Sequence, residues 1–218
     1  MNKEYQKIDT IFERETFGNN KLIPYRWRNP LVEFLNDNVW LATEKIDGTN
    51  IRVYWDGHKV SFAGRTDKAQ IPKHLLEHLE NTFGGETKEQ VFEQMFGEKE
   101  VILYGEGYGP KIQNGGAYRP DVSFILFDVM INGYFLEFKN VIDIARTLGI
   151  DSVPVVAAGT IDDLIKVVAE GRDSTFGTAK MEGVVARPEH TIYDHRGKRI
   201  IVKIKYRDFK DWNDENSQ

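Results

Sequence analysis

Short stretches in which apolar and polar residues alternate recur along the chain, a pattern typical of half-buried β-strands. Ile51, Val53 and Trp55 are separated by single residues, and the Asp56-Gly57 pair directly after them is a turn signal. Together these residues predict a β-hairpin. The same pattern predicts strands over 39–45, 50–55, 59–63 and 100–104.

The spacing of apolar residues becomes helical between positions 72 and 97. Thr87 and Gln90 stand three positions apart, as in a helix capping box, and Gly97 follows the last apolar positions as a stop signal. A shorter helix is expected over 31–35. The first half of the chain therefore predicts hairpins with helices inserted between them.

The second half of the chain mixes both periods. Asn132-Gly133 predicts another hairpin, Thr160 is expected to cap a helix, and Gly149 and Gly171 are expected to end helices. Strands are expected over 123–131, 134–138, 151–157, 183–187 and 199–206, and helices over 140–148 and 161–169. Because hairpins dominate, the sequence predicts an α+β fold with a mainly antiparallel sheet, rather than a doubly wound parallel one.

The composition is typical of a soluble protein with a substantial core, since 40% of the 218 residues are hydrophobic. The net charge of −5 argues against a globally basic nucleic-acid coat protein, but it leaves room for a local basic groove. The sequence has no cysteine, no recognisable secretion signal and no apolar run near the roughly 20 residues that cross a bilayer. We therefore expect a cytoplasmic protein with no membrane partner.

The stretch from Thr43 to Arg52 places a lysine, a carboxylate, a glycine and an amide within six positions. Lys45 lies between two expected strands, where partial desolvation would make its amine easier to deprotonate and a usable nucleophile. We expect this amine to attack the α-phosphate of a nucleotide. The Lys-x-Asp-Gly tetrapeptide alone is weak evidence, because Asp-Gly is also a common turn.

Further charged residues stand at the ends of apolar strands, where burial of a charge without a partner is costly. The set consists of three acids and four bases: Asp47, Glu106, Glu182, Lys45, Arg65, Lys203 and Lys205. The bases suit a triphosphate, and the acids suit Mg²⁺ or its shell of bound water. A solvated surface explains any one of these residues, but it does not explain the whole set in this order.

These residues fall into short motifs that occur in the same order in covalent nucleotidyltransferases. The motifs are Lys45-Ile46-Asp47-Gly48-Thr49-Asn50, Gly64-Arg65-Thr66, Tyr104-Gly105-Glu106-Gly107, Phe124–Val129, Met181–Val185 and Val202–Lys205. The chain resembles the superfamily of polynucleotide ligases and mRNA-capping enzymes, and most of all the RNA ligases of the phage nick-sealing type. The segment Tyr5–Phe12 also resembles the openings of some phage RNA ligases.

The resemblance implies an antiparallel-sheet nucleotidyltransferase domain, ATP-grasp-like and with flanking helices. It also implies a reaction in three steps that uses ATP. Lys45 attacks ATP to give a lysyl–AMP intermediate, AMP passes to a 5′-phosphate end, and a 3′-hydroxyl then seals the RNA strand. Lys203 and Lys205 would act with Lys45 as catalytic residues by neutralising the α-phosphate.

The resemblance also assigns binding roles to other residues of the motifs. Contacts with ATP or AMP are implied for Glu44, Asn50, Arg65, Glu106, Phe127, Glu182, Arg187, Lys203 and Lys205. Mg²⁺ or Mn²⁺ would be held by Asp47, Glu106 and Glu182, mainly through water. Glu106 has a second family role, a hydrogen bond to ribose, and Phe127, which would stack on adenine, is also explained as part of a strand core.

Three features of the sequence depart from particular relatives. Asn50 stands where DNA ligases and capping enzymes usually have arginine, which favours an RNA ligase. Asp47 stands where the nick-sealing phage enzyme has histidine, so the subgroup stays open. Thirteen residues follow Lys205, where larger relatives carry an oligonucleotide-binding or helical domain. We expect a single nucleotidyltransferase domain over 1–218, with 1–40 as an N-terminal extension packed on it.

The expected function is RNA repair by an ATP-dependent RNA ligase acting on nicked or broken ends, duplex ends included. The expected location is the host cytoplasm if the gene is carried by a phage. An accessory protein or a domain supplied in trans stays open, as does the oligomeric state. An ATP-dependent DNA ligase and an mRNA-capping guanylyltransferase are the alternative enzymes. An inactive nucleic-acid-binding module is the alternative of another class.

Overall fold

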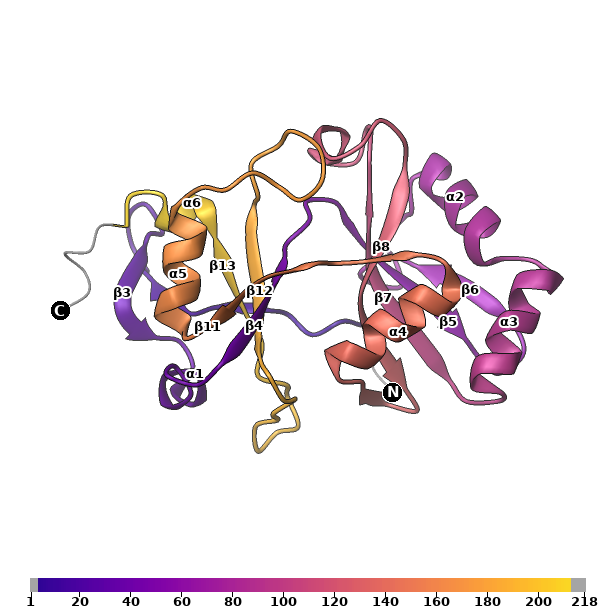
Figure 1. Cartoon of the computed structure of the whole chain (residues 1–218), viewed down its shortest axis with the longest axis horizontal. Coiled ribbons are helices and arrows are strands. Elements are labelled where there is room, and N and C mark those ends of the chain that lie inside the picture. The colour runs from indigo at the N-terminus through magenta and orange to yellow at the C-terminus, as the bar shows by residue number, and fades with distance from the viewer. Residues whose placement is uncertain (1–3, 213–218) are drawn as a thin grey trace. The chain divides into compact units, whose positions relative to one another are not determined.

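The computed structural model describes residues 4–212 of the chain, and they form two compact units. Unit 1 consists of Glu4 and Tyr5 with Ile46–Val153, and unit 2 consists of Gln6–Lys45 with 154–212. Figure 1 shows the strands and helices of each unit. The chain passes from one unit to the other after Tyr5, after Lys45 and after Val153.

Unit 1 is built on a six-stranded sheet in the order β10-β8-β7-β5-β6, with β9 paired to β8. Its strands are β5 (Thr49–Trp55), β6 (Val60–Ala63), β7 (Val101–Tyr108), β8 (Ser123–Ile131), β9 (Tyr134–Phe135) and β10 (Asp151–Ser152). All pairs are antiparallel except β10 with β8. The two hairpins expected at Asp56-Gly57 and Asn132-Gly133 are therefore confirmed.

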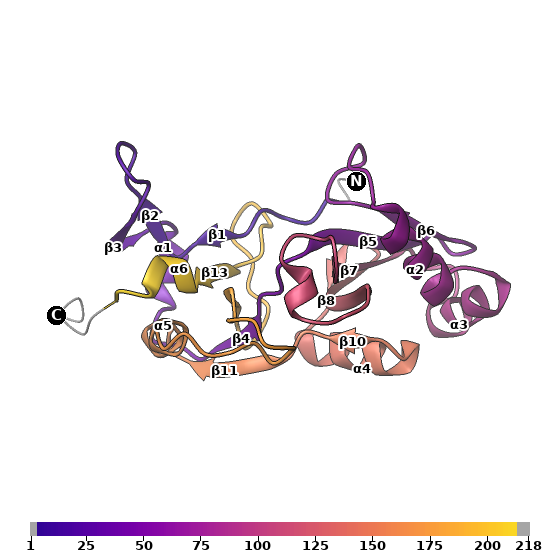
Figure 2. The ribbon, with the colours of Figure 1, turned by 90° about the horizontal axis from the view of Figure 1, so that it is seen from above.

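Three helices accompany this sheet: α2 (Lys73–Phe83), α3 (Glu86–Phe96) and α4 (Phe138–Leu148). Buried Leu75 of α2 lies over Gly107 of β7, and buried Phe83 makes an edge contact with Phe124 of β8. In α3, Phe92 lies against Trp55 of β5. Figure 2 shows α4 alongside β10. Apolar side chains from helices and strands thus form the core of unit 1.

Unit 2 contains a five-stranded sheet in the order β1-β13-β12-β4-β11 and a two-stranded sheet of β2 and β3. The strands are β1 (Asp9–Thr10), β2 (Phe12–Arg14), β3 (Leu22–Trp27), β4 (Trp40–Glu44), β11 (Val155–Gly159), β12 (Gly183–Pro188) and β13 (Val202–Lys205). The helices are α1 (Pro30–Phe34), α5 (Ile161–Ala169) and α6 (Tyr206–Phe209). The central strands come from both ends of the chain, so neither end alone completes this sheet.

The N-terminal segment contributes directly to the core of unit 2. Ile11 and Phe12 are fully buried, and Phe12 packs among the rings of Tyr25, Trp27 and Trp212. Strand β1 pairs in parallel with β13 at the edge of the five-stranded sheet. Residues 6–40 are therefore part of the packed structure of unit 2. The prediction of one nucleotidyltransferase domain over 1–218 stays a prediction.

Some local predictions were wrong in detail. The helical region over 72–97 is divided into α2 and α3 at Gly84 and Gly85, where Gly85 has a positive φ of 87°. Gly85 is the N-cap of α3 and no side chain caps that end, so Thr87 lies inside the helix and the expected capping box is absent. The strand expected over 151–157 is two strands, β10 and β11, which belong to different units.

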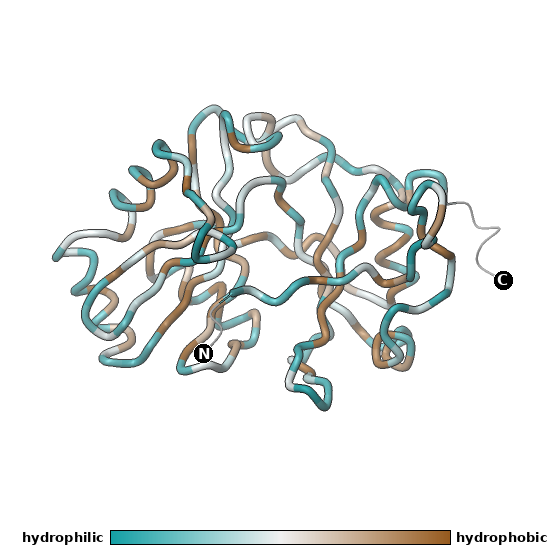
Figure 3. The backbone as a smooth tube through the Cα atoms, turned by 180° about the vertical axis from the view of Figure 1, so that it is seen from behind, coloured by the Kyte–Doolittle hydropathy of each residue, from teal (hydrophilic) through white to brown (hydrophobic). Residues whose placement is uncertain are grey.

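The mixed, mainly antiparallel α+β architecture is confirmed, and Thr160 caps α5 through a capping box with Asp163. Hydrophobic stretches run along the strands, whereas several connecting loops are hydrophilic (Figure 3). Among the described residues, no helix has the length and apolar character that spanning a membrane requires.

Candidate active site

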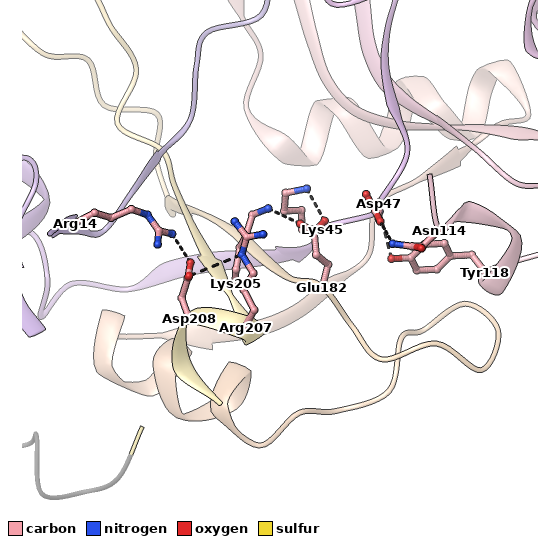
Figure 4. A network of polar contacts seen from close by, with 9 residues as sticks. All are labelled: Arg14, Lys45, Asp47, Asn114, Tyr118, Glu182, Lys205, Arg207 and Asp208. Atoms are coloured by element: carbon pink, nitrogen blue, oxygen red, sulfur yellow. Dashed lines mark hydrogen bonds and ion pairs between the residues drawn. The ribbon is translucent and has the colours of Figure 1, made fainter. Parts of the chain in front are cut away.

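Lys45, Glu182 and Lys205 form a continuous ionic cluster in unit 2 (Figure 4). The Nζ atom of Lys45 lies 2.6 Å from Oε2 of Glu182, and the Nζ atom of Lys205 lies 2.5 Å from Oε1 of the same carboxylate. Each lysine therefore holds a different oxygen. The side chains keep between 15% and 25% of their exposure, so the cluster is shielded but still reachable from solvent.

The register of three neighbouring strands brings this cluster together. Strand β12 pairs with β4 on one side and with β13 on the other, and Gly183 stands opposite Lys205. The N–H of Lys45 donates to the carbonyl of Gly183 at 3.0 Å. A Cβ atom on Gly183 would lie 2.1 Å from the carbonyl oxygen of Ile204, so only glycine permits this approach of β12 to β13.

Burial and charge act in opposite directions on Glu182. Burial raises the pKa of its carboxyl, but the ammonium groups of Lys45 and Lys205 outweigh this effect and hold the pKa below its ordinary value. Glu182 is therefore a carboxylate at neutral pH. It keeps both lysines oriented by charge-assisted hydrogen bonds.

Lys203 lies two residues before Lys205 in β13 and is half-buried. Among the described residues, its ammonium group has neither a hydrogen bond nor an ion pair. Burial lowers the pKa of Lys203, and the nearby positive charges of Lys205 and Lys45 lower it further. A shielded cation beside two others, with one carboxylate among them, favours the binding of an anion.

Glu44 and Arg187 lie on the same strands but are buried. The carboxylate of Glu44 accepts hydrogen bonds from the hydroxyl of Ser174 at 2.5 Å and from the N–H of Thr175 at 2.9 Å, as well as from the Thr175 hydroxyl. Glu44 therefore fixes the loop before β12. Arg187 of β12 keeps only 7% of its exposure.

Asp47 is held by a loop of unit 1 that the sequence did not single out. Its Oδ2 atom accepts a hydrogen bond from Asn114 at 2.8 Å, and its N–H donates to the hydroxyl of Tyr118 at 3.2 Å. Both partners point toward Asp47 in Figure 4. Next to it, a Cβ atom on Gly48 would lie 2.3 Å from the carbonyl oxygen of Gly107, which explains the motif glycine.

Asn50 and Glu106 stand opposite one another on β5 and β7. The Oδ1 atom of Asn50 is buried, and it has no hydrogen-bond partner among residues 4–212. Buried polar atoms nearly always have a partner, so an unpaired one is typical of a group that binds a ligand. Two of the predicted site residues therefore share one face of this sheet.

Phe127 occupies a β-bulge in β8. Tyr104 of β7 pairs with Asp128, and the next residue Gly105 pairs with Leu126, so Phe127 is the additional residue of β8. Bulges redirect side chains and are frequent beside active sites. The ring of Phe127 lies 5.0 Å from the ring of Tyr5 in an edge contact.

Arg65 is exposed and belongs to the turn after β6. Arg52, fully buried in β5, holds this turn: its Nε atom donates to the carbonyl of Gly64 at 2.7 Å and its Nη2 atom to Asp67 at 2.8 Å. Arg52 was not among the residues that the sequence predicted for the site. No local pattern marked it, because the alternation of Ile51, Val53 and Trp55 predicts that Arg52 faces solvent.

Within residues 4–212, no group of three or more His, Cys, Asp or Glu side chains could hold a metal ion. Asp47 and Glu106 belong to unit 1, and Glu182 belongs to unit 2. Their carboxylate oxygens are ligands that Mg²⁺ and Mn²⁺ prefer, and Oδ1 of Asp47 has no partner among the described residues. The donor chemistry fits the metal, and its binding through water stays a prediction.

The structure thus brings Lys45, Glu182, Lys205 and Lys203 together in unit 2, and pairs Asn50 with Glu106 in unit 1. The sequence missed the partners of these residues: Asn114, Tyr118, Ser174 and Thr175. Ser174 and Thr175 stand about 130 positions from Glu44, and no local pattern links them. The glycines around Asn114 were the one available signal of a constrained loop.

The sequence profile of RNA ligases matches residues 38–205, which cover all six motifs. The chain belongs to the RNA ligase family. A search of curated protein sequences gave no match. The subgroup of phage nick-sealing RNA ligases stays a prediction.

Solved structures of an RNA ligase from Naegleria gruberi share the fold. A mutant solved with ATP and Mn is 14% identical, with a TM-score of 0.62 over 93% of this chain and 61% of that one. A mutant solved with AMP and Mn is 16% identical, with a TM-score of 0.64 over 95% and 63% of the two chains. The chain therefore spans about three fifths of the length of these RNA ligases.

Proposed function

We propose that the protein is an ATP-dependent RNA ligase that forms a covalent lysyl–AMP intermediate at Lys45. The observation that carries this proposal is the cluster in which Lys45 and Lys205 share the carboxylate of Glu182 beside Lys203, which makes no hydrogen bond or ion pair among residues 4–212. A nucleophilic amine next to two further cations suits attack on a phosphate. Membership of the RNA ligase family supports the same reaction.

In the first step, Nζ of Lys45 bonds to the α-phosphorus of ATP while the bond from that phosphorus to the pyrophosphate oxygen breaks. The ammonium group, which donates to Glu182 in this structure, must first release a proton so that its electron pair is available. Lys203 and Lys205 would neutralise charge on the phosphate oxygens. Such in-line displacements depend chiefly on positioning and on charge stabilisation.

Residues of both units have roles in binding ATP in this proposal. Phe127 would stack on adenine, and Asn50, Arg65 and Glu106 would contact ribose or phosphate. Glu44 and Arg187 are buried, so only a small part of either side chain is open to contact with a nucleotide. A divalent cation would neutralise phosphate charge, and Asp47, Glu106 and Glu182 would hold it mainly through water. The relatives solved with ATP and Mn or AMP and Mn support the choice of ATP and a divalent cation as cofactors.

The later steps transfer AMP to a 5′-phosphate end of RNA and join that end to a 3′-hydroxyl, with release of AMP. RNA ends, nicked or broken, are the proposed substrate. An accessory protein or a domain supplied in trans for the sealing step stays a prediction. We further propose that the protein acts in the cytoplasm.

Incubation with α-labelled ATP and Mg²⁺ or Mn²⁺ tests the first step. A covalent adduct that survives denaturation is expected with the wild type and is expected to be lost in Lys45→Ala. Lys59→Ala is the matched control, because Lys59 is an exposed lysine in the turn before β6 and should leave labelling unchanged. A wild type that binds ATP without forming any adduct would instead support a binding module.

The substrate is tested with nicked duplexes that differ only in the sugars beside the nick. An enzyme specialised for RNA repair should require ribose at the 3′-hydroxyl side, because the 2′-hydroxyl is what distinguishes RNA from DNA there. Equal sealing of ribose and deoxyribose ends would favour a DNA ligase. Labelling by GTP in preference to ATP would favour a guanylyltransferase.

A further inference from the structure

The side chain of Tyr5 lies in an aromatic cluster of unit 1 whose other members come much later in the chain. Its ring centroid is 5.0 Å from that of Tyr104, 5.0 Å from that of Phe127 and 5.9 Å from that of Phe135. Its hydroxyl donates a hydrogen bond to Oδ2 of Asp128 at 2.7 Å. The first described residues of the chain therefore meet the bulge that carries Phe127.

Asp128 gives this contact its importance. It is fully buried in β8, and it stands opposite Tyr104, which is also fully buried. A buried carboxylate is costly unless it accepts hydrogen bonds, so the Tyr5 hydroxyl helps to keep the carboxylate in place. Because Asp128 directly follows Phe127, a fixed Asp128 also fixes the backbone of the bulge.

The geometry of the rings shows what Tyr5 does to Phe127. The two planes meet at 70°, an edge contact rather than a stack. Such a contact stabilises the position of the Phe127 ring from one side and leaves at least one ring face uncovered by Tyr5. Tyr5 can therefore hold Phe127 still while a flat ligand group lies against it.

The same segment continues to the other group of proposed ATP-binding residues. Five residues after Tyr5, Thr10 of β1 stands opposite Lys203 of β13 in unit 2. The segment thus contacts the strand of the proposed adenine-stacking residue at one end and the strand of a proposed phosphate-binding lysine at the other. Tyr5 is thus packed within unit 1, and Thr10 is paired within unit 2.

We infer that Tyr5 is a positioning residue for adenine recognition, acting through Phe127 and Asp128. The inference rests on the proposed function, because it assigns adenine to Phe127. Tyr5 itself touches no reacting atom. Its loss should weaken ATP binding and base selectivity more than it slows the transfer of AMP to Lys45.

The experiment compares Tyr5→Leu, Tyr5→Phe and the control Tyr134→Phe. Tyr134 is 75% exposed, so removal of its hydroxyl should change nothing. Tyr5→Leu removes both the ring contact and the hydroxyl and should raise KM for ATP about three- to tenfold, with kcat for adenylylation nearly unchanged. Tyr5→Leu should also show a smaller preference for ATP over GTP than the wild type. Tyr5→Phe keeps the ring and should show a smaller change.

A spectroscopic readout separates this inference from the proposed function. With 4-fluorophenylalanine at position 127, the ¹⁹F signal should shift and broaden in Tyr5→Leu but not in Tyr134→Phe. Absence of a lysyl–AMP adduct in the wild type would contradict the proposed function alone. The fluorine signal would still test whether Tyr5 positions the ring of Phe127. An unchanged signal, or an adduct formed by folded Tyr5→Leu with wild-type KM and base preference, would overturn the inference.

Discussion

Glu182 accepts one hydrogen bond from Lys45 and another from Lys205, so its charge controls the geometry of both lysines. Its pKa lies below the ordinary value of 4.5 because the two cations outweigh the effect of burial. A carboxyl whose pKa is lower in the folded state contributes stability above its unfolded pKa and loses that contribution as pH falls through the folded one.

We therefore predict that Glu182→Gln lowers the free energy of unfolding by about 1–3 kcal/mol at pH 7. The difference between wild type and variant should shrink below pH 4.5 and vanish once the wild-type carboxyl is protonated. Urea denaturation at several pH values measures it. A difference that stays constant down to pH 3 would show that the ion pairs are not its cause.

Removal of the charge of Lys203 should change the stability of the protein in the opposite direction. Among the described residues Lys203 makes no hydrogen bond or ion pair, and burial and two neighbouring cations outweigh the favourable charge of Asp9, so its charge is a cost to the fold. We predict that Lys203→Met leaves stability unchanged or raises it by about 0.5–1 kcal/mol, while adenylylation falls by at least about 100-fold. Thermal unfolding and labelling with ATP measure the two effects. Clear destabilisation would contradict this assignment.

At the scale of the elements, Gly48 sets the distance between the Lys45 motif and β7. A Cβ atom there would lie 2.3 Å from the carbonyl oxygen of Gly107, a backbone atom that cannot move aside cheaply. We predict that Gly48→Ala destabilises the protein by about 1–3 kcal/mol and reduces adenylylation. Gly116→Ala is the control, because its nearest contact would be an ordinary 3.4 Å. Equal unfolding midpoints of both variants would contradict the steric explanation.

The helices and strands also show which parts of the fold the sequence could predict. Alternation and turn pairs predicted β5, β6 and β8 because local periodicity and local turn chemistry determine them. The division of 151–157 into β10 and β11 could not be predicted, because the two strands pair with partners in different units. The bulge at Phe127 likewise depends on its pairing with β7, which lies about 20 residues earlier in the chain.

The candidate site likewise contains residues that the sequence predicted and others that it did not. The order of the motifs predicted Lys45, Glu182 and Lys205, and the register of β4, β12 and β13 brings them together. The partners that hold other site residues, such as Asn114 on Asp47 or Tyr5 on Asp128, have no sequence pattern of their own. They follow from tertiary packing, which single-sequence reasoning does not reach.

On the scale of the whole molecule, the two units differ in how the chain builds them. Unit 1 is nearly continuous, whereas β4 of unit 2 pairs with β11 and β12, which come more than 100 residues later. We predict that a fragment of residues 46–153 folds cooperatively, whereas a chain truncated after residue 153 leaves unit 2 unfolded. Hydrogen exchange tests the folding of the fragment, because the backbone amides of β5, β7 and β8 should be protected from exchange in it. A fragment without protected amides would contradict it.

The ionic cluster around Glu182 has a consequence for the proposed intermediate. Lys45 and Lys205 share the carboxylate of Glu182, and their positive charges also act on Lys203, on which the carboxyl of Asp9 acts in the opposite sense. Bonding of AMP to Lys45 would remove one cation and add one anionic phosphate, so the net positive charge of the group would fall by two. The proposed reaction product would thus reduce the crowding of positive charge in the resting protein, and we expect the adenylylated protein to be a long-lived state that can be isolated and stored.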